Sequence, residues 1–222
     1  MKKFKALKIL LIGFYIVTFN FAYAQVKPIV EGVDYTILAS AVDPTVEPKG
    51  KVNVKEFFSF SCPFCKAAEP FVDASLIPNK SIDLERVQVV WDDVTATYAK
   101  LNATLDIMNI TKMYPIIFNE VKAEQGIEGK EYVQGINQPS KIKSLFATNG
   151  YSAAQVDKIM ATYNSFSVSA KVAQYKTMMT KYNINSTPTF IVADKYVVSA
   201  ASPARLVEVV QELVKKQLQN KK

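Results

Sequence analysis

The chain contains 222 residues, of which 49% are hydrophobic, and carries a formal net charge of +7. It has two cysteines and no histidine, so one copy cannot supply the full ligand set of a closed zinc site. Its length suits one domain of fair size with its own hydrophobic core.

The N-terminal segment has the pattern of a secretory signal peptide. Four lysines come first, an apolar run from Ile9 to Val17 follows, and Ala22-Tyr23-Ala24 ends it as an A-x-A cleavage pattern. The apolar run is too short to span a bilayer, so we expect residues 1–24 to be removed and a soluble mature chain to begin at Gln25. Their removal takes away four lysines and no acids, which lowers the net charge to +3. The charge therefore does not predict nucleic-acid binding.

The predicted elements of the first part of the mature chain are mostly strands. A short strand at 35–38 precedes a connection at 43–50 that is rich in proline and glycine. A strand over 52–60 then leads into a helix over 64–71, and Pro70 is expected to kink or end that helix. The β-branched run at 87–91 predicts a second core strand.

After Val94 the spacing of apolar residues becomes helical. We expect helices over about 94–108, 113–123, 139–148, 152–163 and 168–182, with a polar loop over 124–138. The runs 189–193 and 196–199 predict a β-hairpin, and Pro203 begins a last helix after the capping residue Ser202. This order predicts an α/β fold with an inserted helical subdomain at about 94–184.

Both cysteines, Cys62 and Cys65, stand where the strand over 52–60 gives way to a helix. Cys62 falls at the predicted helix N-cap, where unpaired backbone N–H groups and the helix dipole favour a thiolate. Cys65 follows one turn later, within reach of a disulfide, and Pro63 takes the first helical position, where its missing N–H costs nothing. The pattern favours a redox-active pair over two alternatives. These are a metal shared between two chains and a permanent disulfide, whose short loop stabilises little.

Glu56 is the one carboxylate on an otherwise apolar face of the same strand. It shares this face with Val54 and Phe58, because alternate side chains of a strand point the same way. A buried carboxylate is costly unless it has a partner or a role. Two interpretations stay open: Glu56 accepts or relays a proton beneath Cys65, or it is a salt-bridged or water-bonded group with no catalytic part.

Together these segments resemble the DsbA family of periplasmic thiol:disulfide oxidoreductases. The most specific matches are Glu56 to Phe60 followed by Cys62-Pro63-Phe64-Cys65, then Asn164 to Phe166 running into Val172 to Gln174, and finally Thr187-Pro188. The resemblance implies a thioredoxin-like fold interrupted by a helical domain. It also implies a cis peptide bond before Pro188 and a Thr187 backbone that pairs with substrate beside Cys62.

The same resemblance implies an activity and its partners. It implies an oxidase that introduces disulfide bonds into reduced exported proteins and is reoxidised by a quinone-linked membrane partner of the DsbB type. The Cys62–Cys65 disulfide carries the electrons, so no cofactor and no metal is expected, and we expect a monomer in the periplasm. Two alternatives are a disulfide reductase or isomerase, and a peptide-binding chaperone without turnover.

The chain departs from the family pattern at two points. The best-known members carry Cys-Pro-His-Cys, whereas this chain has Phe64, which offers Cys62 neither charge nor hydrogen bond. Pro63, Phe64 and Glu56 are the candidate residues that tune the redox couple. We expect a less depressed pKa of Cys62 and a less oxidising couple than in the histidine-bearing members. Some members also place a buried lysine near the counterpart of Glu56, and the segment 87–93 contains none.

Overall fold

The computed structural model describes residues 27–38, 48–125, 131–134, 136, 138–199 and 202–220. The predicted signal peptide at 1–24 lies outside these residues, as do residues 43–47 of the predicted connection. No helix in the described part of the chain is long and apolar enough to cross a membrane.

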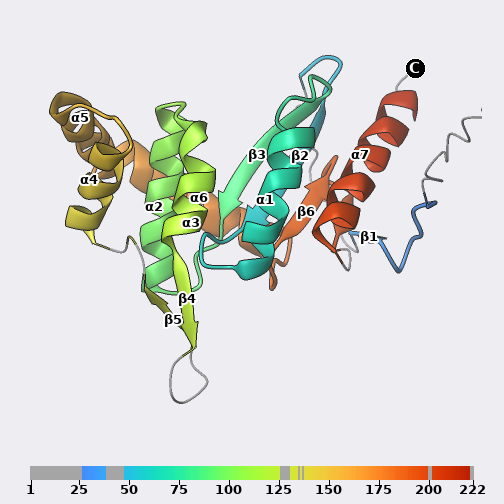
Figure 1. Cartoon of the computed structure of the whole chain (residues 1–222). Helices are drawn as coiled ribbons and strands as arrows, with labels where there is room; N and C mark the ends of the chain where they lie inside the picture. The colour runs from blue at the N-terminus through green and yellow to red at the C-terminus, as the bar shows by residue number, and fades with distance from the viewer. Residues whose placement is uncertain are drawn as a thin grey trace, which may run out of the picture.

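A five-stranded sheet in the order β1-β7-β6-β2-β3 lies at the centre of the fold (Figure 1). Its strands are β1 (Tyr35–Ile37), β2 (Val52–Phe58), β3 (Ile82–Gln88), β6 (Thr189–Val192) and β7 (Tyr196–Val198). β2 pairs in parallel with β3 and antiparallel with β6, so it lies inside the sheet, and all of its residues are buried. The predicted hairpin of β6 and β7 is confirmed.

Helices cover both faces of this sheet. They are α1 (Pro63–Ser75), α2 (Asp93–Ile107), α3 (Tyr114–Glu120), α4 (Pro139–Thr148), α5 (Ala153–Tyr163), α6 (Phe166–Lys181) and α7 (Pro203–Asn220), with a 3-10 turn at Thr111–Met113. α1 and α7 pack through Val72 and Val210 on one face, and α2 and α6 pack through Ala99 and Tyr175 on the other. The helices α2 to α6 follow one another between β3 and β6, and α4 and α5 lie farthest from α7 (Figure 1). This confirms the predicted α/β fold with inserted helices.

Two predicted strand and loop assignments are wrong. β3 begins at Ile82 and ends at Gln88, earlier than the run predicted at 87–91. Its parallel register with β2 supplies the backbone hydrogen bonds, so a segment rich in charged residues becomes a strand without an apolar run. The predicted loop at 124–138 includes most of a two-stranded hairpin, β4 (Lys122–Gln125) and β5 (Glu131–Gln134). Short polar strands of this kind lack the alternation that indicates a strand.

Two predicted helix ends also differ. α1 continues past Pro70 to Ser75. Pro70 and Lys66, four residues earlier, are both exposed, so water can bind the carbonyl that the proline leaves without a donor. The helix predicted over 113–123 ends at Glu120, because the chain enters β4 at Lys122.

Candidate active site

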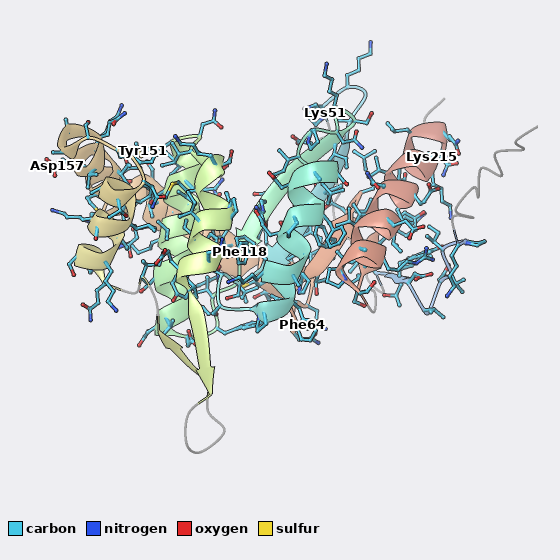
Figure 2. All side chains as sticks on the ribbon, viewed as in Figure 1. Lys51, Phe64, Phe118, Tyr151, Asp157 and Lys215 are labelled. Atoms are coloured by element: carbon cyan, nitrogen blue, oxygen red, sulfur yellow. The ribbon has the colours of Figure 1, made fainter. Side chains whose placement is uncertain are left out.

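α1 begins at the cysteine pair, as the sequence predicts. Cys62 is the N-cap residue, with extended backbone angles, and its Sγ accepts a hydrogen bond from the backbone N–H of Cys65 at 3.4 Å. Pro63 takes the first helical position. Both cysteines are free thiols, and Cys62 is partly exposed whereas Cys65 is buried. Phe64, between them, lies at the N-terminal end of α1 (Figure 2) and is 70% exposed.

The two thiols differ in acidity because their surroundings differ. The Cys65 thiol donates to the Cys62 sulfur, and this outweighs burial and lowers the pKa of Cys62 to about 6. The Thr187 side chain and the backbone N–H groups of Cys65 and Phe64 lower it further. Burial raises the pKa of Cys65 well above its ordinary value, and the neighbouring Cys62 raises it more. Near neutral pH, Cys62 is therefore mostly a thiolate while Cys65 keeps its proton.

The Thr187-Pro188 segment lies against Cys62, although 125 positions separate Cys62 and Thr187 in the sequence. The Cys62 Sγ lies 3.4 Å from the Thr187 carbonyl, to which it donates when it is protonated. The peptide bond between Thr187 and Pro188 is cis, as the family resemblance implies. A cavity of about 230 Å³ opens beside them, and Phe64 and Leu206 supply part of its apolar lining. Cys62 thus lies next to Thr187, which lines a cavity with room for side chains of another molecule.

A buried ion cluster lies deeper under α1. Arg86 of β3 donates from Nε to Glu56 Oε2 at 2.6 Å and from its two terminal nitrogens to Glu69 of α1 at 3.1 and 2.5 Å. Its guanidinium also stacks over the rings of Phe58 and Tyr114. The second oxygen of Glu56, Oε1, is buried and has no hydrogen-bond partner. Burial raises the pKa of Glu56 although Arg86 opposes the rise.

This cluster decides part of the question that the sequence left open about Glu56. The carboxylate is salt-bridged, as the second interpretation requires, but its unpaired oxygen and its raised pKa also suit proton transfer. The segment 87–93 contains no lysine, and the cation beside Glu56 is Arg86, one residue before that segment. The strand register pairs Glu56 with Arg86 directly. The sequence alone does not give this register, nor the packing of α1 that brings Glu69 to Arg86.

The described residues include no group of three or more His, Cys, Asp or Glu side chains placed to hold a metal ion. A dithiol at the N-terminus of a helix, with a cis proline across from it on a sheet of this order, defines a protein of the thioredoxin class. The thioredoxin family model matches residues 47–212.

Comparison with known proteins narrows the class. The chain is 30% identical to the thiol:disulfide interchange protein DsbA of Pseudomonas syringae pv. tomato over 205 residues, covering 90% of this chain and 89% of that protein. It is 32% identical to DsbA of Burkholderia cepacia, covering 90% and 91%. The oxidoreductase NmDsbA1 from N. meningitidis superposes with a TM-score of 0.67 at 26% identity, covering 86% of this chain and 95% of that chain. The chain therefore belongs to the DsbA family, and it is a thiol:disulfide oxidoreductase.

Proposed function

We propose that this protein introduces disulfide bonds into exported proteins by exchange at Cys62. The observation that carries the proposal is the contrast between a partly exposed Cys62, with a pKa lowered to about 6, and a buried Cys65, whose pKa is raised. A substrate thiolate attacks the Cys62 sulfur of the Cys62–Cys65 disulfide, which forms a mixed disulfide and releases Cys65 as a thiolate. A second substrate thiolate then attacks the substrate sulfur, and Cys62 leaves with the electron pair. A leaving thiol of low pKa departs faster, which favours oxidation of the substrate.

Glu56 supplies the proton that Cys65 needs when it is released. Its unpaired Oε1 and raised pKa support this role, and its charge raises the pKa of Cys65. A protonated Glu56 can give its proton to the released Cys65 thiolate, and Arg86 then stabilises the ionised Glu56 through its hydrogen bond. Glu56→Gln removes the proton and keeps the shape, so substrate oxidation should slow and lose part of its pH dependence. An unchanged pH profile would leave Glu56 as a structural partner of Arg86.

Substrates bind as extended segments beside Cys62. The half-buried Thr187 beside Cys62 and the cavity that Thr187 and Pro188 line support this, because a segment joined to Cys62 must pass over them. Pro63 and Phe64 tune the couple from the same turn. Reoxidation by a quinone-linked membrane protein of the DsbB type, and export to the periplasm after removal of residues 1–24, complete the proposed cycle. Kinship with the named DsbA proteins supports both.

A direct assay tests the direction of exchange. The purified protein should oxidise a reduced, unfolded ribonuclease in the presence of glutathione disulfide, and Cys62→Ser should abolish this. Cys65→Ser keeps Cys62, the cysteine that forms the mixed disulfide, and should accumulate mixed disulfides that collapse on reduction. A wild-type protein that reduces insulin but does not oxidise ribonuclease is a reductase. One that rearranges scrambled ribonuclease is an isomerase, and one that does none of these but binds unfolded peptide is a chaperone.

A further inference from the structure

Gln88, the last residue of β3, is completely buried, and every polar group of its side-chain amide is hydrogen-bonded. Its Oε1 accepts from the backbone N–H of Phe60 at 2.9 Å. Its Nε2 donates to Ser59 Oγ at 3.2 Å and to the Val89 carbonyl at 3.0 Å. Both amide hydrogens and the oxygen therefore have partners, which leaves this side chain a single orientation.

Two of the three partners of Gln88, Ser59 and Phe60, lie in the turn that carries Cys62. The backbone N–H of Cys62 donates to the Ser59 carbonyl at 3.0 Å, which closes the turn Ser59–Cys62. The backbone N–H of Ser61 donates to Ser59 Oγ at 3.3 Å, and the two serine hydroxyls lie 2.9 Å apart. Ser59 is thus bonded to Gln88 on one side and to the exchange cysteine on the other.

This turn needs such support because β2 has already ended. β2 stops at Phe58, whose register partner is Gln88, so Phe60 lies beyond the strand ladder. Phe60 is 1% exposed, and a buried backbone N–H requires an acceptor. The side-chain oxygen of Gln88 accepts from the Phe60 N–H in place of a strand partner, and so fixes the chain where it leaves the sheet. Gln88 itself makes none of its hydrogen bonds to either cysteine.

We propose that Gln88 is a positioning residue for disulfide exchange: it holds the turn Ser59–Cys62 in the geometry in which Cys62 caps α1. The inference rests on the proposed exchange at Cys62. The cap geometry directs backbone N–H groups at the Cys62 sulfur, and these stabilise a thiolate more than a disulfide sulfur. Loosening the turn should therefore cost the reduced form more than the oxidised form.

Gln88→Met tests this, because methionine keeps the length and volume of the side chain and removes its three hydrogen bonds. The reduced and oxidised forms are equilibrated with glutathione at fixed pH. We expect the equilibrium to move about tenfold toward the disulfide form, which is about 30 mV for a two-electron couple. A residue with a merely structural role destabilises both redox forms equally and leaves the equilibrium unchanged. A change below about threefold overturns the proposal, and a larger change toward the disulfide supports it.

A second pair of variants decides the matter if Gln88→Met does not fold. Ser59→Ala removes one bond of Gln88 and should move the equilibrium in the same direction by at least about threefold. Thr104→Val is its matched control, because it also removes a buried hydroxyl, which within the described part of the chain bonds to the Lys100 carbonyl of α2. If Ser59→Ala behaves like Thr104→Val, the proposal fails. A wild-type protein that does not exchange with glutathione at all contradicts the proposed function instead.

Discussion

Replacing Cys65 with alanine tests the cause of the acidity of Cys62. The Cys65 thiol donates to the Cys62 sulfur, and this hydrogen bond is the largest contribution to a pKa lowered to about 6. A hydrogen bond to a charged group is worth about 1.5–3 kcal/mol, and about 1.4 kcal/mol corresponds to one pKa unit. Cys65→Ala should therefore raise the pKa of Cys62 to between about 7 and about 8. At pH 6 the thiolate fraction would fall from about one half to below about one tenth.

The assay is a pH titration of the ultraviolet absorbance of the thiolate in each reduced variant. Cys65→Ser is the matched control, because serine keeps a hydroxyl donor at the same position and the backbone N–H of residue 65 remains in both variants. The serine variant should titrate near the wild-type value, and only the alanine variant should shift. If both variants titrate like the wild type, the donor at position 65 does not set the acidity. The helix N-terminus alone would then account for it, and the reasoning is refuted.

Three further predictions follow from the site. Alkylation of the reduced protein near neutral pH should label Cys62 before Cys65, and peptide mapping that finds Cys65 labelled first contradicts the assignment of roles. Phe64→His adds a hydrogen-bond donor next to Cys62 and should make the Cys62–Cys65 couple more oxidising by on the order of 30 mV, which corresponds to about 1.4 kcal/mol. An unchanged redox titration removes Phe64 as a tuning position. Arg86→Met leaves Glu56 buried without its cation and should lower the free energy of unfolding by about 3–5 kcal/mol at neutral pH. Because the folded-state pKa of Glu56 is raised, this loss should shrink as pH falls and the carboxyl is protonated, so urea unfolding that shows an equal loss at pH 5 and pH 8 contradicts it.

The structure also explains why Phe64 is tolerated beside the exchange cysteine. Its side chain is 70% exposed and so does not fill the core, and a phenyl ring has no donor to offer Cys62. The acidity of Cys62 comes instead from Cys65, from Thr187 and from backbone N–H groups. The couple is therefore predicted to be oxidising without a histidine in the motif, though less so than in members that carry one.

Several features were determined by the sequence itself because their causes are local. The N-cap at Cys62 and the proline that follows it each depend on residues within one helical turn. The hairpin of β6 and β7 and the long helices follow from short-range apolar periodicity. Such signals act over a few residues, so they can be recognised without knowing how the chain packs.

The chemistry around the cysteines was decided by tertiary structure. Arg86 forms an ion pair with Glu56 because β2 and β3 pair in one parallel register. It forms a second ion pair with Glu69 because α1 packs over that face of the sheet. Gln88 looks like an ordinary polar residue at the end of a charged segment, yet the same register places its amide under the turn of Cys62. Buried ion pairs and amide bonds form between residues far apart in the chain, and their partners depend on register and helix placement, which local propensity does not encode.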